Sequence, residues 1–208
     1  MKIAIYGAGG FGREIAPIAR RLIAQEDGHG GSLVFVDDDV RQHARDRVVP
    51  VIPFEEARGY RFVLATAAAK VRRKLADKTA GQSISLVAST AIIGPDVSIG
   101  EGAVICDFSV LTTSATIGRQ FHCNIFSHVG HDCVVGDFVT LAPRVSVNGN
   151  TVIEDDVYIG TGAILLNGIP GRPLRVGKGA TIGMGAVVTA DVPPGVTVFG
   201  NPARILRA

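Results

Sequence analysis

Residues 124–138 read Asn-Ile-Phe-Ser-His-Val-Gly-His-Asp-Cys-Val-Val-Gly-Asp-Phe and lie inside a long run with a period of six. One position of each repeat is uncharged and mostly aliphatic. Its occupants are Ile93, Ile99, Ile105, Leu111, Ile117, Cys123, Val129, Val135, Leu141, Val147, Ile153, Ile159 and Leu165. The residue two places earlier is mostly small, as at Ala103 and Ser109. An amphipathic α-helix needs a period of about 3.6, so this pattern excludes one.

The physics of the repeat follows from strand alternation. Residues i and i−2 of a strand face the same side, so both positions are expected to face inward. Three short strands then close one triangular coil, and aliphatic side chains stack from coil to coil in a solenoid. We expect the glycines that follow the aliphatic position, such as Gly94 and Gly130, to turn the corners with their permissive backbone. The series breaks after Leu165, where residues 167–173 read as a loop, and it resumes at Val176.

The region before the repeats alternates strands and helices, which is typical of a small parallel α/β unit. The sequence predicts strands at 2–6, 33–36, 48–52 and 62–65, and a helix at 69–78. Another helix follows the first strand, with Ile15, Ile18 and Leu22 on one face. Pro17 must lie in the first turn of that helix or bend it.

A glycine motif opens this region. Gly7, Gly9 and Gly12 match G-x-G-x-x-G, after a strand and before a helix. Backbone N–H groups and a positive helix end at such a turn face a phosphate or another polar ligand group. Asp37 and Asp38 end the next strand, where a carboxylate accepts hydrogen bonds from a ribose or a base. The alternative is a plain tight turn beside a solvated acidic loop; the agreement of motif, strand and acids favours a nucleotide site.

Composition excludes several classes of protein. The net charge of +2, without a Lys/Arg block, argues against a nucleic-acid partner. No apolar run is long enough to cross a membrane, and the amino terminus lacks the features of a signal peptide. Cys106, Cys123 and Cys133 are odd in number and fall inside the repeats. We therefore expect reduced thiols in a cytoplasmic protein.

The hexapeptide run, the segment at 127–138 and the ending Gly-Asn-Pro-Ala-Arg at 200–204 resemble a family of bacterial nucleotide-sugar acetyltransferases. This is the sialic acid O-acetyltransferase-like (NeuD/PglD-like) family of the hexapeptide-repeat superfamily. The resemblance covers essentially the whole chain, including Gly-Ala-Gly-Gly-Phe-Gly. It implies an α/β, Rossmann-like nucleotide-sugar-binding domain at residues 1–85, followed by a left-handed parallel β-helix acyltransferase domain at residues 86–208.

The resemblance also implies an activity. We expect acetyl-CoA-dependent N- or O-acetylation of a nucleotide-linked sugar for surface glycans, by a homotrimer with its sites between neighbouring subunits. Family motifs place the general base on His131 and the acid that raises its basicity on Asp132. The acceptor-binding residues implied are Gly9, Gly10, Phe11, Asp37, Asp38, Ala67 and Asn124. The acetyl-CoA contacts implied are Thr140, Thr161, Gly183 and Met184. No metal is expected.

Three departures from the family pattern leave the particular sugar open. Thr140 stands where some relatives carry a histidine that contacts acetyl-CoA. Ala67 replaces a glycine and cannot adopt every glycine conformation. Phe11 replaces the histidine of a Gly-His-Gly turn.

The chemistry fits a neutral imidazole, which can accept the proton of the acceptor at physiological pH. A carboxylate partner would fix its tautomer and favour the imidazolium that forms. We expect direct attack on the thioester in a ternary complex. Cys133 is the covalent rival, but its inward i−2 position favours a buried structural thiol.

The remaining histidines have simpler interpretations. His122 and His128 each precede an inward position, so we expect both to point outward, on successive faces of the prism. That arrangement prevents them from sharing a metal with His131 within one chain. His128 either lines the site or is a surface residue. His29 and His43 lie in polar loops, where we expect them to be solvated.

The sequence is compatible with three functions. The leading hypothesis is the acetyltransferase. The alternative is a non-catalytic trimeric scaffold that binds a nucleotide sugar, against which the intact His131–Asp132 pair argues. A nicotinamide oxidoreductase is suggested by G-x-G-x-x-G alone.

Overall fold

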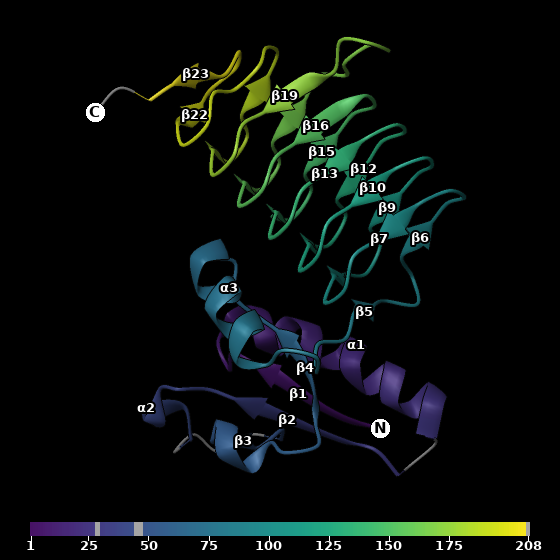
Figure 1. The fold of residues 1–208 in the computed structure, drawn as a ribbon, viewed down its shortest axis with the longest axis vertical. Coiled ribbons are helices and arrows are strands. Elements are labelled where there is room, and N and C mark those ends of the chain that lie inside the picture. The colour runs from purple at the N-terminus through teal and green to yellow at the C-terminus, as the bar shows by residue number, and fades with distance from the viewer. Residues whose placement is uncertain (28–29, 44–47, 207–208) are drawn as a thin grey trace. The chain divides into compact units, whose positions relative to one another are not determined.

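The structure is a computed structural model that describes residues 1–27, 30–43 and 48–206. It divides into two compact units, Met1–Leu86 and Val87–Ala208 (Figure 1). The sequence placed this boundary one residue earlier. Among the described residues, no helix has the length and apolar character needed to cross a membrane. His29 lies outside the described residues, and the side chain of His43 is not described.

The first unit contains a parallel sheet in the order β3-β2-β1-β4. Its strands are β1 (Lys2–Tyr6), β2 (Ser32–Val36), β3 (Val51–Ile52) and β4 (Arg61–Leu64). Three of them lie within a residue of the prediction. The third is shorter than the predicted 48–52, because Pro50 has no N–H to donate to the ladder and only its carbonyl accepts, from Phe35 at 2.8 Å.

Helices cover both faces of this sheet. They are α1 (Gly10–Asp27), α2 (Val40–His43), the short 3₁₀ turn η1 (Phe54–Glu56) and α3 (Ala69–Lys78). Ile15 and Ile18 of α1 are buried as predicted, and Leu22 is half-buried. Pro17 lies inside α1, which excludes the first-turn alternative. On the opposite face, α3 packs against an apolar cluster that includes Tyr6 and Phe62.

Two glycines let α1 start close to the end of β1. Gly7 has a φ of 117°, and a Cβ there would lie 2.9 Å from the carbonyl oxygen of Ala65. A Cβ at Gly12 would overlap the carbonyl oxygen of Gly7. Gly7 and Gly12 of the motif are therefore required by packing, whatever binds to the turn.

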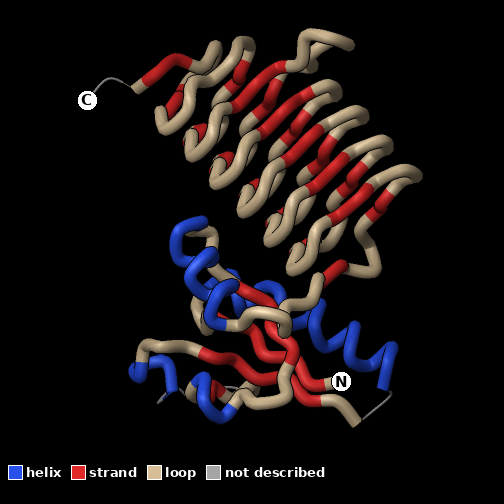
Figure 2. The backbone as a smooth tube through the Cα atoms, viewed as in Figure 1, coloured by secondary structure: helices blue, strands red, loops and turns tan. Residues whose placement is uncertain are grey.

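The second unit is a parallel β-helix with three faces, and its short strands are joined by tight corners (Figure 2). The first face runs through β5 (Leu86–Val87), β8 (Val104–Ile105), β11 (His122–Cys123), β14 (Thr140–Leu141), β17 (Tyr158–Ile159), β20 (Thr181–Ile182), β22 (Thr197–Phe199) and β23 (Arg204–Ile205). The second runs through β6 (Ile92–Ile93), β9 (Val110–Leu111), β12 (His128–Val129), β15 (Ser146–Val147), β18 (Ile164–Leu165) and β21 (Val187–Val188). The third runs through β7 (Ser98–Ile99), β10 (Thr116–Ile117), β13 (Val134–Val135), β16 (Thr151–Ile153) and β19 (Leu174–Val176).

The core of the coil is the predicted row of aliphatic residues. From Ile105 to Leu165, every member of the row is at most 3% exposed, and each such buried side chain contributes roughly 1.5–3 kcal/mol. The first two members depart from the prediction: Ile93 is 40% exposed and Ile99 is half-buried. They lie on β6 and β7, the end strands of their sheets, so no earlier coil covers them.

The corners contradict the prediction that the glycines after the inward position supply a permissive backbone. The left-handed residues lie two places further on, and most are not glycine. They are Asp96, Gly102, Phe108, Ser114, Gln120, Phe126, Asp132, Phe138, Arg144, Asn150, Asp156 and Gly162, with φ between 50° and 71°. The predicted glycines instead let adjacent coils approach. At Gly136, a Cβ would lie 2.7 Å from the backbone N of Asp155 in the next coil.

Replacing Gly136 with alanine should therefore push two coils apart. We expect the free energy of unfolding to fall by roughly 1–3 kcal/mol, the usual cost of overpacking. Gly179→Asn is the control, because Gly179 has a φ of 67° and a Cβ there would meet no atom within 4 Å. Its stability should change by no more than about 0.5 kcal/mol. Urea unfolding at one fixed protein concentration measures both; equal losses would contradict this account of the corners.

Candidate functional site

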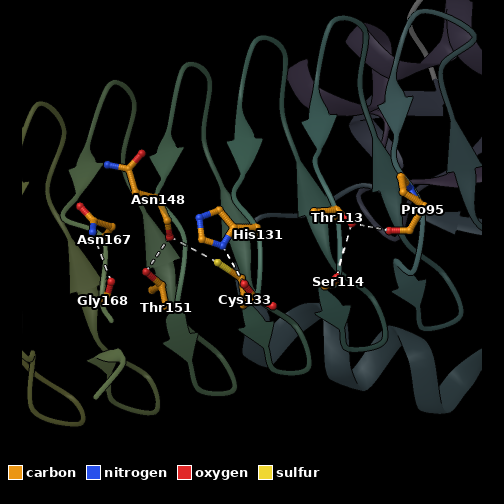
Figure 3. Close-up of polar contacts among 10 residues, drawn as sticks. Pro95, Thr113, Ser114, His131, Cys133, Asn148, Thr151, Asn167 and Gly168 are labelled. Atoms are coloured by element: carbon orange, nitrogen blue, oxygen red, sulfur yellow. Dashed lines mark hydrogen bonds and ion pairs between the residues drawn. The ribbon is translucent and has the colours of Figure 1, made fainter. Parts of the chain in front are cut away.

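Most of the predicted coil residues lie on two edges of the coil, where the chain passes from one face to the next. We define the first edge as residues 106–109, 124–127, 142–145, 160–163 and 183–186, and the second edge as residues 94–97, 112–115, 130–133 and 148–150. The second edge borders a cavity of about 610 Å³. Its lining residues are Thr112, Thr113, His128, Gly130, His131, Asn148, Gly149 and Asn167. Figure 3 shows Thr113, His131, Asn148 and Asn167 on successive coils.

His131 and Asp132 form the polar centre of this cavity. The Nδ1 of His131 lies 2.7 Å from Oδ2 of Asp132, and both side chains are more than half exposed. A carboxylate can only accept, so Nδ1 is the donor in this contact, and Nε2 is not part of it. Asp132 reaches back to its neighbour because it is a left-handed corner residue, with a φ of 56°. The pair therefore presents an oriented imidazole to the cavity.

A glycine in the next coil makes room for the imidazole. A Cβ at Gly149 would lie 2.5 Å from Nε2 of His131. Strand pairs such as His128 with Ser146 show that equivalent residues of adjacent coils lie 18 positions apart. Gly149 is thus the residue stacked on His131, and its missing side chain lets the ring lie across the backbone of the next coil.

The thiol of Cys133, the residue after the His131–Asp132 pair, is buried inside the coil. Cys133 is 1% exposed, and its Sγ donates to the carbonyl oxygen of Asn148 at 3.3 Å (Figure 3). Burial raises the pKa of the Cys133 thiol, and burial raises the pKa of Cys123 to about 12. Cys133 therefore stays protonated inside the coil, as predicted for a structural thiol.

The other predicted coil residues lie away from His131 within the chain. Asn124, Thr161, Gly183 and Met184 fall on the first edge, while Thr140 is buried on β14 of the first face. Asn124 is 9% exposed, and one of the two hydrogens on its Nδ2 is already donated to the carbonyl oxygen of Leu141, at 2.7 Å. Met184 is 75% exposed. Phe199 covers Gly183, where a Cβ would overlap its ring. One chain does not bring these residues to His131.

The predicted positions of the two strand histidines are only partly correct. They lie on different faces, β11 and β12, as predicted. His122 is fully buried, however, rather than exposed on an outward face. Its partners in register, Val104 and Thr140, are buried as well, so this part of the first face is not in contact with solvent. His128 is half-buried and lines the cavity of His131.

No group of three potential metal-ligating side chains occurs in the described part of the chain. His122 and His128 occupy different faces of the coil, and His131 lies on the second edge. The residues described here thus offer no site fitted to a resident metal ion.

The first unit brings the remaining predicted residues together. Three parallel strands end at one edge of its sheet, so the loops after them are neighbours. The predicted residues in these loops are Gly9, Gly10 and Phe11 after β1, Asp37 and Asp38 after β2, and Ala67 after β4. The backbone around Gly9 and Gly10 is open, because a Cβ at either would meet no atom within 4 Å. Ala67 is exposed and does not have a positive φ, so this loop does not need the glycine of the relatives.

Sequence reasoning missed residues around both sites. Thr112, Asn148 and Gly149 surround His131, and the 18-residue coil would have pointed to Gly149, because it is His131 displaced by one coil. Tyr6 and Lys78 contact Asp38 in the first unit. No local signal identifies that pair, since the two residues are 72 positions apart.

The chain is similar to known proteins along its full length. Residues 2–79 match the family described as the PglD N-terminal domain. The chain is 43% identical to the GDP-perosamine N-acetyltransferase of Escherichia coli O157:H7, over 98% of this chain and 95% of that protein. The structure of WeeI from Acinetobacter baumannii AYE has a TM-score of 0.91 and 42% identity, covering 99% of this chain and 100% of WeeI. The acetyltransferase domain of PglB from Neisseria gonorrhoeae FA1090, solved with acetyl coenzyme A, has a TM-score of 0.86 and 31% identity, covering 99% of this chain and 98% of that one.

The burial of the thiols leads to a test of the covalent alternative. With all three cysteines buried and burial raising the pKa of Cys123 and Cys133, we expect no rapid reaction with Ellman's reagent near neutral pH. All three should react once the protein is unfolded in guanidinium. Fast modification of one thiol in the folded protein, with loss of function, would make Cys133 a candidate nucleophile again.

Proposed function

The chain belongs to the NeuD/PglD-like family of hexapeptide-repeat sugar acetyltransferases, and from this premise we propose that His131 is the base that activates a sugar amine. Acetyl-CoA is the co-substrate. GDP-perosamine is the first acceptor to test, because the Escherichia coli relative is named for it. The product would serve surface glycan synthesis in the cytoplasm.

The oriented imidazole carries this proposal. Asp132 engages Nδ1 at 2.7 Å, which leaves Nε2 as the only basic atom that the ring offers to the cavity. A general base must lie within hydrogen-bond reach of the proton that it removes, and a half-exposed ring on an open cavity permits this. The carboxylate also stabilises the imidazolium that forms.

The reaction needs no covalent enzyme intermediate. The amine nitrogen attacks the thioester carbonyl while Nε2 of His131 takes its proton. The tetrahedral intermediate then collapses, the carbon–sulfur bond breaks, and the imidazolium returns the proton to the leaving thiolate. The backbone N–H of Gly149, beside Nε2, is our candidate donor for the oxyanion. The buried Cys133 takes no part.

The first unit would hold the nucleotide. Ligands of open parallel sheets bind outside the carboxyl ends of the strands, where the loops with Gly9, Gly10, Phe11, Asp38 and Ala67 lie. We also propose that this unit is Rossmann-like and that the coil is left-handed, because the family resemblance implies both.

A homotrimer completes the site. The base lies on the second edge, whereas Asn124 and the expected acetyl-CoA contacts Thr161 and Met184 lie on the first. A prism has its edges on different sides, so the second edge of one subunit would meet the first edge of a neighbour. Each active site would then combine His131 of one chain with the donor-binding edge of another.

The proposal is tested by thiol release from acetyl-CoA with a panel of GDP-, UDP- and CMP-linked sugars. We expect turnover with an amino sugar and a loss of about 10²–10⁴-fold in kcat for His131→Ala, the usual contribution of a general base. Gly149→Ala keeps the imidazole but displaces it, so it should also lower kcat, with little change in the melting temperature. Full turnover in His131→Ala would rule out this base. Absence of turnover with every sugar, beside tight binding of one nucleotide, would support a binding scaffold.

The trimer is tested by complementation. His131→Ala lacks the base, and Thr161→Tyr places a bulky ring at an exposed position of the donor-binding edge. Each variant alone should be nearly inactive, and co-expression should restore part of the activity, because some sites then combine two intact edges. Light scattering should give three times the chain mass. A monomeric mass, or no recovery on co-expression, would contradict a shared site.

A further inference from the structure

The two acids after β2 have different environments. Both oxygens of Asp37 are used within the chain: Oδ2 accepts from the N–H of Ala8 at 2.7 Å, and Oδ1 accepts from the N–H of Asp39 at 2.9 Å. Asp37 therefore ties the glycine turn after β1 to the loop after β2. Its carboxylate therefore has a structural role in these two loops.

The two oxygens of Asp38 differ in their contacts with the rest of the chain. Its Oδ1 accepts from the hydroxyl of Tyr6 at 2.7 Å and from Nζ of Lys78 at 3.2 Å. Its side chain is 65% exposed. Among the described residues, no hydrogen bond is made to its Oδ2. The exposed oxygen is therefore available to a donor from outside the chain.

The two residues that hold Asp38 are themselves fixed. Tyr6 is 2% exposed, and its ring packs on Phe54 and Phe62, with centroids 5.9 and 6.2 Å away. Lys78, the last residue of α3, donates to the hydroxyl of Tyr6 at 2.6 Å. Its ammonium also lies 4.4 Å from the centroid of the Phe54 ring, a cation–π distance. Residues of strand β1 and helix α3 thus meet at one carboxylate oxygen, and Phe54 of the turn η1 packs against both of them.

This cluster lies at the edge of the sheet where a nucleotide would bind. The acid after the second strand of such a unit is placed to accept hydrogen bonds from a nucleoside. We propose that Tyr6 and Lys78 are positioning residues that hold Asp38 so that its Oδ2 accepts a hydrogen bond from the nucleoside part of the acceptor, an inference that rests on the proposed function. Asp37 is then a structural residue of the turn, and Asp38 is the one of these two acids that contacts the ligand.

The ionisation of Asp38 agrees with this role. The hydrogen bond from Tyr6 lowers the pKa of Asp38 below its ordinary value, with a further contribution from Lys78. The carboxylate stays ionised at neutral pH, so it acts only as an acceptor. An N–H of a base or a hydroxyl of a ribose would satisfy it.

The test measures GDP binding by calorimetry, and acceptor kinetics, with the full-length protein. Tyr6→Phe keeps the packed ring but removes the hydroxyl, and Lys78→Met removes the ammonium. We expect each to raise the Kd for GDP and the KM for the nucleotide sugar by roughly tenfold, the size of one hydrogen bond to a charged group, while kcat and the KM for acetyl-CoA are retained. Asp38→Asn should weaken binding at least as much, and Lys78→Arg should restore part of the affinity.

Matched controls separate this role from general effects. Lys74→Met removes an exposed ammonium one turn earlier in α3, and Tyr60→Phe removes a hydroxyl that accepts from the hydroxyl of Ser32 at 3.4 Å. Neither should change the Kd for GDP. Binding of 2′-deoxy-GDP tells a donor at the 2′-hydroxyl from any other donor, because Asp38→Asn should have no further effect on a nucleotide that lacks the group that donates to Asp38.

Two outcomes would overturn the inference. If Asp38→Asn weakens GDP binding but Tyr6→Phe and Lys78→Met do not, the pair does not position the carboxylate. If Asp38→Asn binds GDP as tightly as wild type, Asp38 does not contact the nucleotide. Failure of the proposed function looks different, since wild type would then turn over no nucleotide sugar at all.

Discussion

The parallel hydrogen-bond ladder between successive coils is the interaction on which the second unit depends. Its strands are two or three residues long, too short to be stable alone. They persist because each donates to the coil on one side and accepts from the other, as where Val110 donates to Ser127 at 3.0 Å and His128 donates to Val145 at 2.9 Å. Parallel strands lie about 4.7–4.9 Å apart, so this spacing limits which residue fits at each position of the repeat.

That spacing also explains how the imidazole of His131 is accommodated in a structural repeat. Gly130, just before His131, has no side chain because the backbone N of Gly149 in the next coil would lie 2.6 Å from its Cβ. Asp132, just after, adopts the left-handed corner conformation. His131 is therefore held between two positions that the fold constrains strongly. The imidazole is free to extend only because Gly149, one coil later, leaves a gap in the wall.

The first unit uses a different kind of constraint. Its sheet brings the ends of β1, β2 and β4 together, and polar contacts then give the two acids after β2 different tasks. Asp37 accepts hydrogen bonds from the backbone N–H groups of two loops. Asp38 accepts from Tyr6 and Lys78 with Oδ1, and its other oxygen is left exposed. Adjacent residues of the same type thus have different environments, because distant segments of the chain supply different partners to each.

Local pattern alone determined much of this protein. The period of six predicted the stacked coil and its inward row, the predicted helix at 69–78 matches α3, and the adjacency of His131 and Asp132 placed a carboxylate within reach of an imidazole. These features depend on neighbours in the chain or on a strict repeat. Only the tertiary structure decided the rest. The conformation of the corners, the burial of His122, the separation of His131 from Thr161 on different edges, and the pairing of Tyr6 with Lys78 all depend on which distant segments pack together. Such contacts leave no periodic trace in the sequence, because they are set by the path of the chain through space.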